Sequence, residues 1–152
     1  MDIVQELQKL IDALRTASIP YALCGGFGLA VYGITRATED IDLMVEERSL
    51  PGIRELARQL GFRFNPQPLV FKDGGVQIHR LHKTEGEDFL VLDLLLVTPL
   101  TQPAWENQRQ VETDFGTVRV VSPRGLIHLK SLRASGQDED DIRRLKELGD
   151  ES

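Results

Sequence analysis

The chain has 152 residues, 41% of them apolar and 28% charged, which is ordinary for a globular protein and predicts a single domain over residues 1–152. Apolar runs such as 94–97 are far too short to cross a bilayer, and no signal peptide is recognisable. Cys24 is the only cysteine, which excludes an internal disulfide and favours a cytoplasmic protein without a membrane segment. The net charge of −6 argues against a wholly basic nucleic-acid-binding surface, although basic residues gather at 124–133 and 143–146.

The first third of the chain predicts a helix, a strand, a short helix, a strand and a helix. Apolar residues at helical spacing mark a helix over residues 3–14, and "YALC" (21–24) is typical of a buried strand that ends at a glycine pair. "FGLAVYG" (27–33) predicts a short helix, and "DIDLMVE" (40–46) predicts a strand. Ser49, Pro51 and Gly61 bound a further helix over 49–61.

The remainder predicts several strands followed by two helices. "FRF" (62–64), "VQIHRLHK" (76–83) and the very apolar "DFLVLDLLLV" (88–97) indicate strands, and 110–122 indicates a hairpin that turns near Gly116. Ser122-Pro123 opens a helix to about residue 132, and a last helix begins at Asp138, which would cap it. The predicted fold class is therefore α/β (α+β), a mixed β-sheet with helices packed on it.

Two carboxylates stand two residues apart in the strand at 40–46. Side chains two apart on a strand share a face, so Asp40 and Asp42 project together while Ile41 and Leu43 point into the core. Like charges about 4 Å apart repel by about 1 kcal/mol in water and about 4 kcal/mol at an effective dielectric of 20. A hard cation such as Mg²⁺ or Mn²⁺ would turn that repulsion into attraction, whereas the simpler alternative is that both acids lie on the solvent face of an amphipathic strand.

Asp93 is the one charged residue among the apolar residues 89–97. A buried acid is costly unless something pairs with it. It is either an ion-paired structural acid or, placed beside Asp40 and Asp42, the third member of a metal-binding triad.

The glycine pair Gly25-Gly26 lies between a strand and a short helix. It belongs to neither a dinucleotide-binding fingerprint, which would need a glycine at Val31, nor a Walker motif, because no Gly-Lys-Ser/Thr follows. Glycines there let backbone amides approach an anion closely, and the same pair would also suit a purely structural tight turn.

These features together resemble the DNA polymerase β-type nucleotidyltransferase superfamily. The matching segments are "CGGFGLAVYGITRATEDIDLMV" and "LDLLLV", with thirteen residues between Gly26 and Asp40. The chain is most similar to the small bacterial domains related to the AbiEii toxin, including at its end, where Lys130 is followed by "QDEDDI". The resemblance spans about residues 20–145 and implies the nucleotidyltransferase fold.

The resemblance also implies a site. Gly25 and Gly26 would cradle the triphosphate of an NTP, and Asp40, Asp42 and Asp93 would hold two Mg²⁺ ions, with Asp93 helping to deprotonate an acceptor hydroxyl. Further nucleotide contacts would come from Arg36, Thr38 and Lys130. The alternatives are that Arg36 and Thr38 belong to an exposed loop and that Lys130 is a solvated lysine of an amphipathic helix.

The implied reaction moves an NMP from an NTP to an acceptor hydroxyl and releases pyrophosphate. The acceptor would be tRNA, a protein or a small molecule, and a second copy of the chain or a partner protein would complete its recognition. A role in a toxin–antitoxin system follows from the same resemblance. The alternatives are a non-catalytic, antitoxin-like binding module and a structural metal-binding protein, but the presence of all three carboxylates favours the enzyme.

Overall fold

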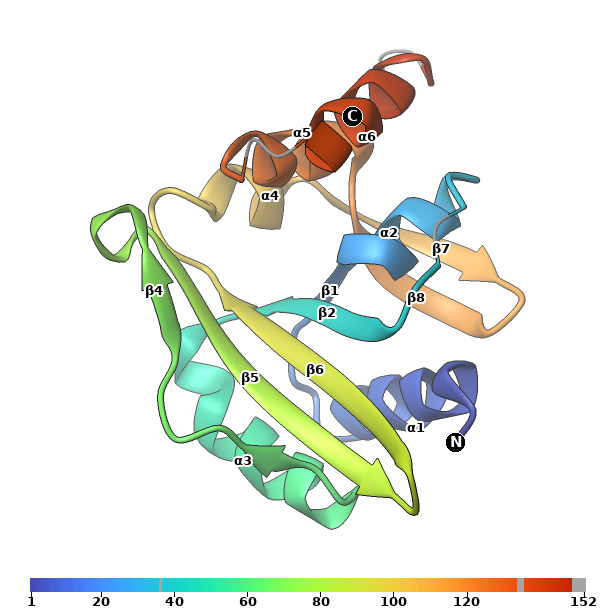
Figure 1. Cartoon of the computed structure of the whole chain (residues 1–152), viewed down its shortest axis with the longest axis vertical. Coiled ribbons are helices and arrows are strands. Elements are labelled where there is room, and N and C mark those ends of the chain that lie inside the picture. Colours follow the sequence, from blue (N-terminus) through green and yellow to red (C-terminus); the bar gives the residue numbers. More distant parts are fainter. Residues whose placement is uncertain (36, 134–135, 149–152) are drawn as a thin grey trace.

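The computed structural model describes residues 1–35, 37–133 and 136–148, with residues 136 and 137 described by their helical backbone alone. A mixed β-sheet runs through this part of the chain, with the strand order β3-β5-β6-β2-β1-β8-β7, and β4 lies on β5 (Figure 1). The pairs β1–β8 and β2–β6 are parallel, and the other pairs are antiparallel. The strands are β1 (Ala22–Cys24), β2 (Asp40–Val45), β3 (Arg63–Phe64), β4 (Leu69–Phe71), β5 (Val76–Glu85), β6 (Asp88–Leu96), β7 (Gln108–Thr113) and β8 (Gly116–Val121).

Helices cover the two faces of this sheet unequally. Figure 1 shows α1 and α3 together at one side and α2, α4, α5 and α6 at the other. The helices are α1 (Ile3–Thr16), α2 (Gly25–Val31), α3 (Leu50–Gln59), α4 (Gln102–Glu106), α5 (Pro123–Ser131) and α6 (Gly136–Lys146), with the 3-10 turns η1 (Glu47–Ser49) and η2 (Lys72–Gly74). No helix of the described residues is long and apolar enough to span a membrane.

The alternation along β2 separates the core from the site. Ile41 and Leu43 are fully buried in the larger apolar cluster, which α1 and α3 complete. Asp40 and Asp42 are partly exposed on the opposite face, where a smaller cluster includes Cys24, Met44 and residues of α5 and α6. The sequence pattern of β2 is therefore confirmed: its apolar face packs and its acidic face is left for other use.

Local sequence explains why the helices begin where they do. The carboxylate of Asp2 accepts hydrogen bonds from the backbone N–H groups of Val4 and Gln5, and Leu7 and Leu14 of α1 are fully buried. At α5, Ser122 accepts from the backbone N–H of Gly125 and Pro123 takes the first position, as the sequence predicts.

Several expected boundaries are wrong. The glycine pair does not precede the short helix but forms its first turn, α2. Ser49 makes no capping hydrogen bond through its side chain. The last helix begins at Gly136, so Asp138 lies inside its first turn and is not its cap. The strand β4 and the helix α4 were not expected at all, because each is too short to show a periodic pattern.

Candidate active site

The sheet brings the three predicted acids together on one face. In the parallel pair β2–β6, Asp42 lies directly opposite Asp93, and Asp40 lies one side-chain step away on the same face of β2. Neighbouring strands are about 4.8 Å apart, so these carboxylates are near neighbours although about fifty residues separate them in sequence. The hypothesis that Asp93 meets the pair Asp40 and Asp42 is consistent with this register.

A residue that the sequence analysis missed, Arg80, holds Asp93. Arg80 lies opposite Asp93 in the antiparallel pair β5–β6. Its Nε donates to Oδ1 of Asp93 at 2.8 Å and its Nη2 donates to Oδ2 at 3.0 Å, while the Asp93 side chain is 11% exposed. This two-pronged geometry is the strong form of a charge-assisted hydrogen bond. Asp93 is therefore the ion-paired acid that sequence reasoning allowed, and it also lies beside Asp42.

Burial and neighbouring charges raise the pKa values of the two acids of β2. Burial raises the pKa of Asp42 to about 6, with repulsion from Asp93 and Asp40 adding to it. Burial, followed by repulsion from Asp93, also raises the pKa of Asp40. In the described part of the chain, no three His, Cys, Asp or Glu side chains are already clustered as a metal site, and both oxygens of Asp93 are given to Arg80.

The glycine turn lies directly against Asp42. Cys24, the last residue of β1, is opposite Asp42 in the sheet, and Gly25 follows it with a φ of 61°, in the left-handed region. A Cβ atom added to Gly25 would overlap the Asp42 carboxylate. A Cβ atom added to Gly26 would come within 2.8 Å of Oγ1 of Thr38. The glycines are needed because the carboxylate of β2 and the loop before it pass so close to the turn.

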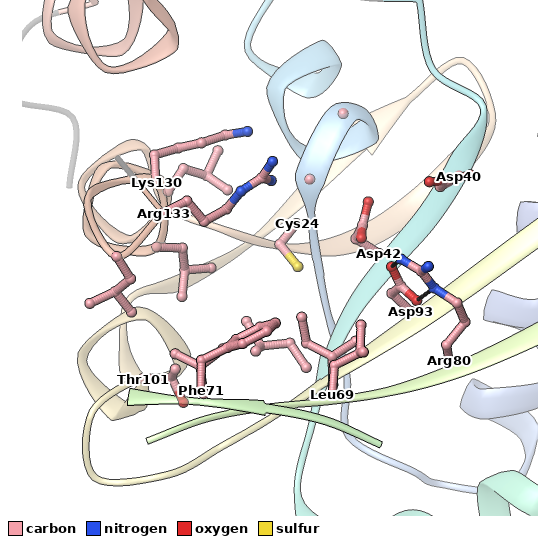
Figure 2. A pocket seen from close by; sticks show the side chains of 18 of the residues that line it. Cys24, Asp40, Asp42, Leu69, Phe71, Arg80, Asp93, Thr101, Lys130 and Arg133 are labelled. Atoms are coloured by element: carbon pink, nitrogen blue, oxygen red, sulfur yellow. Dashed lines mark hydrogen bonds and ion pairs between the residues drawn. The ribbon is translucent and has the colours of Figure 1, made fainter. Parts of the chain in front are cut away.

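The acids and the glycines open into a cleft of about 600 Å³, between the sheet and α5. Figure 2 shows Asp40, Asp42 and Asp93 on one side, Lys130 and Arg133 across from them, and Leu69 and Phe71 along a third side. Arg80 and Cys24 line the same space. Burial raises the pKa of the Cys24 thiol well above its ordinary value, so this cysteine is a neutral wall of the cleft and not a nucleophile.

Lys130 lines the cleft and also forms ion pairs with α6. Its Nζ is 3.4 Å from Oδ1 of Asp138 and 3.4 Å from Oδ2 of Asp141, and both aspartate side chains are 1% exposed. Arg133 pairs with Asp138 at 3.3 Å. Lys130 is thus not the solvated lysine of the alternative interpretation: its side chain is 12% exposed and links the two C-terminal helices at the edge of the cleft.

Two predicted site residues, Arg36 and Thr38, precede β2 in the sequence. Thr38 lines a smaller hollow of about 150 Å³ that adjoins the cleft, together with Gly26, Asp40 and Lys130. Arg36 is outside the described residues. The structure therefore brings Gly25, Gly26, Thr38, Lys130 and the three acids to one place.

The sequence could have indicated that Arg80 lies opposite Asp93. Gly86 marks the turn between β5 and β6, and counting outward from that turn places Arg80 opposite Asp93, as the register shows. Leu69 and Phe71 gave no such signal, because β4 has three residues and is defined by its pairing with β5.

Solved structures of similar fold define the class of the fold. ANT(2″)-Ia in complex with adenylyl-2″-tobramycin is 16% identical, with a TM-score of 0.66 over 96% of this chain and 89% of that chain. The lincosamide antibiotic adenylyltransferase LnuA, lincomycin-bound, is 16% identical, with a TM-score of 0.57 over 93% and 95%. An antigenic nucleotidyltransferase-like protein from Paracoccidioides brasiliensis is 20% identical, with a TM-score of 0.61 over 95% and 77%. The fold is that of nucleotidyltransferases.

The family follows from the sequence itself. Residues 9–138 match the family described as "Nucleotidyl transferase AbiEii toxin, Type IV TA system". The chain belongs to this AbiEii family of nucleotidyltransferases. None of the curated protein sequences matches it.

Proposed function

We propose that the chain transfers a nucleoside monophosphate from an NTP to an acceptor hydroxyl and releases pyrophosphate. One observation carries this proposal: Asp42 and Asp93 are register partners, beside Asp40 and against the glycine turn, at the wall of a cleft. Nucleotidyl transfer needs phosphate-binding backbone amides next to a cluster of carboxylates, and the nearness of the glycine turn to Asp42 supports this function.

The donor set fits a hard divalent cation. Burial, and after it repulsion between the acids, raises the pKa of Asp42 and Asp40, and a cation among these carboxylates would offset both effects. We assign Asp40, Asp42 and Asp93 as the residues that would hold Mg²⁺ or Mn²⁺, since these metals favour carboxylate oxygens. When bound, the metal would supply positive charge for the phosphate oxygens.

The rest of the cleft supplies the nucleotide contacts. The backbone N–H groups of Gly25 and Gly26 would donate hydrogen bonds to phosphate oxygens, because glycine has no side chain of its own to block their approach. Lys130, together with Arg36 and Thr38, would neutralise and orient the same phosphates. The acceptor oxygen then bonds to the α-phosphorus, the bond from that phosphorus to the β-phosphate oxygen breaks, and pyrophosphate leaves with the electron pair.

Asp93 is our candidate for accepting the hydroxyl proton. Each carboxylate oxygen has two lone-pair directions, so a carboxylate held by Arg80 still offers one direction per oxygen. Arg80 fixes the orientation of Asp93 in this scheme and does not itself touch the reacting atoms.

The biological setting that we propose is a toxin–antitoxin pair in the cytoplasm, where NTPs are abundant and Cys24 stays reduced. The family description supports the toxin role. The acceptor classes are tRNA, a protein and a small molecule, and a second copy of the chain or a partner protein would complete the recognition of the acceptor.

The Arg80–Asp93 pair favours a second candidate, a non-catalytic binding module that neutralises a partner. A carboxylate already satisfied by an arginine has less need of a metal. The two functions differ at Asp42: the enzyme needs this carboxylate as a metal ligand, whereas the binding module does not.

The experiment is a transfer assay with α-labelled NTPs, Mg²⁺ and separate pools of tRNA, protein and small molecules. The wild type should label one pool, and Asp42→Asn should lower the rate by about 100-fold or more. Asp12→Asn, which changes an acid on α1 whose side chain is 73% exposed, should leave the rate unchanged. If the wild type is as inert as Asp42→Asn toward every pool and neither binds NTP, the binding module replaces the enzyme.

A further inference from the structure

An apolar floor continues the site along the same face of the sheet. We define it as Leu69 and Phe71 of β4, Val76 and Ile78 of β5, and Leu95 of β6. Leu69 lies opposite Ile78, Phe71 opposite Val76, and Ile78 opposite Leu95, so the five side chains share one face and line one cleft. Leu69 is 39% exposed and Phe71 is 49% exposed, and together with their three neighbours they form a contiguous apolar patch, which is more informative than a single exposed apolar residue.

The floor belongs to the same face as the acids. Side chains alternate along strands, so Ile78 and Arg80 share a face on β5, and Leu95 and Asp93 share it on β6. Arg80 and Asp93 thus form the border between the apolar floor and the acidic cluster. A ligand on the floor would reach the acids without crossing a strand.

The acids lie between the floor and the glycine turn. The sheet order runs from β4 and β5 through β6 and β2 to β1, and the glycine turn follows β1. Figure 2 shows the same order, with Leu69 and Phe71 on one side of Asp42 and Asp93 and the start of α2 on the other. The two ends of the cleft therefore differ in kind: one offers backbone amides and cations, and the other offers apolar surface.

This order decides which substrate each end suits. In phosphoryl-group transfer the attacking and leaving oxygens are roughly in line on opposite sides of the phosphorus. If the leaving pyrophosphate lies at the glycine turn, the attacking hydroxyl enters from the side of the floor. We propose, on the basis of the function proposed above, that the floor binds the acceptor and that this acceptor is a small hydroxyl compound with an apolar face.

The charges around the floor support this class of acceptor. The floor itself carries no charged group, and the charged residues at its borders that line the cleft include the cations Lys72 and Arg80. A polycationic acceptor would be repelled by Lys72 and would find acids only where the reaction takes place, because Arg80 is already paired with Asp93. A nucleic-acid acceptor would need basic residues along the floor, whereas Lys130 and Arg133 lie across the cleft from the acids and pair with Asp138 of α6, in a chain whose net charge is −6. A cleft of about 600 Å³ is in the range of small-molecule sites.

The chemical step is the same as that proposed above. The hydroxyl of the floor-bound acceptor loses its proton to Asp93, its oxygen bonds to the α-phosphorus, and pyrophosphate leaves. The acceptor gains an NMP group, and no oxidant or reductant is consumed.

A fluorinated aryl alcohol tests the floor directly. We would titrate 2-(4-fluorophenyl)ethanol into the protein with Mg²⁺ and a nonhydrolysable NTP, and follow binding by ¹⁹F NMR. Phe71→Ser and, separately, Leu69→Ser should weaken its binding by about fivefold or more. Val70→Ser is the matched control, because Val70 is 52% exposed on the other face of the same strand and should leave binding unchanged.

A calorimetric titration with the nonhydrolysable NTP distinguishes an acceptor on the floor from two other occupants, the nucleobase and a second copy of the chain. The NTP affinity should be equal in wild type, Phe71→Ser and Val70→Ser. If Phe71→Ser weakens the NTP instead of the alcohol, the floor holds the nucleobase and the proposal is overturned. If the wild type binds no alcohol and Phe71→Ser dissociates a dimer on size-exclusion chromatography, the floor is a contact between two copies, which also overturns it.

Binding of the alcohol to the floor and transfer of the nucleotide can be tested independently. Asp42→Asn should keep the alcohol affinity and lose transfer of label to the same alcohol. A wild type that binds the alcohol but labels no acceptor pool would refute the proposed reaction and, with it, the acceptor role of the floor, while the binding result would stand.

Discussion

Four side chains in register across the sheet determine the behaviour of the site at the scale of single residues. Arg80, Asp93, Asp42 and Cys24 come from four successive strands, β5, β6, β2 and β1. The guanidinium compensates only one of the acids in this row, and the thiol compensates none. Asp42 lies outside this ion pair, and burial, with repulsion from Asp93 and Asp40 adding to it, raises its pKa to about 6, which is the electrostatic cost of keeping this acid ionised in the fold.

This cost makes the stability of the fold depend on pH. The pKa of Asp42 rises from an ordinary value of 3.8 to about 6 on folding, so the folded chain holds this proton more tightly than the unfolded chain does. The ionised carboxylate is thus destabilising, fully so above pH 6, and the penalty is relieved as the pH falls from 6 toward 4. A two-unit shift corresponds to at most about 3 kcal/mol, and the partial exposure of Asp42 reduces this to about 1–2 kcal/mol.

We expect Asp42→Asn to be more stable than wild type by about 1–2 kcal/mol at pH 8 without divalent cations, and the difference to shrink by pH 4.5. Urea unfolding in EDTA at both pH values measures it. Asp12→Asn is the control and should show no such trend. Equal free energies of unfolding for wild type and Asp42→Asn at both pH values would contradict the electrostatic cost assigned to Asp42.

Arg80 is expected to matter more than a surface arginine does. Arg80→Met removes both hydrogen bonds from a carboxylate that is 11% exposed and lies next to Asp42, and should cost about 1–3 kcal/mol. Arg58→Met breaks a pair with Glu55 whose side chains are 70% and 58% exposed, so solvent screens it and its loss should destabilise the fold much less. Thermal unfolding in EDTA compares them.

The effect of Mg²⁺ on stability also distinguishes Arg80→Met from Arg58→Met. Mg²⁺ should restore part of the stability lost in Arg80→Met, because a cation replaces the missing charge, and should do nothing for Arg58→Met. A loss in Arg80→Met no larger than in Arg58→Met would show that the Asp93 carboxylate does not need its partner.

At the scale of elements, the turn between β1 and α2 has a strict steric requirement. Gly25 and Gly86 have nearly the same positive φ, 61° and 62°, so alanine strains the backbone alike at both. At Gly25 the new Cβ would meet the Asp42 carboxylate, whereas a Cβ added at Gly86 would have no atom within 4 Å beyond its chain neighbours in the described part of the chain. The difference between the two substitutions isolates the contact from the strain.

Gly25→Ala should therefore lose transfer activity and about 1–3 kcal/mol of stability beyond the loss in Gly86→Ala, which should stay active. Denaturant unfolding and the labelled-NTP assay measure the two effects. Similar stability and activity in both variants would mean that Asp42 moves aside freely and that the turn does not shape the site.

The same scale shows what sequence could and could not foresee. Periodicity predicts α1 and β2, each of which buries one face in the core, while a nearly unbroken apolar run predicts β6 and the turn at Gly116 predicts the hairpin β7–β8. The strand β4 escapes such analysis: its three residues alternate between the cleft and the opposite side, and only its pairing with β5 defines it. The helix α4 has five residues and escapes for the same reason.

At the scale of the whole molecule, the sheet order assembles the site. The glycine turn and the acids of β2 are near in sequence and could be linked by motif, but Asp93 joins them only through the parallel pairing of β2 with β6. That register is non-local, so the residues could suggest it only through resemblance to a family. Lys130 and its buried partners Asp138 and Asp141 likewise depend on how α5 and α6 pack together.

One measurement tests the central claim most directly: a crystal structure with Mn²⁺ and a nonhydrolysable NTP, with the metal located by its anomalous scattering. We expect manganese between Asp40, Asp42 and Asp93, with the triphosphate against Gly25 and Gly26 and the apolar floor left open. Manganese elsewhere, or an Asp93 that contacts only Arg80 while the nucleotide lies outside the cleft, would contradict the metal–nucleotide site.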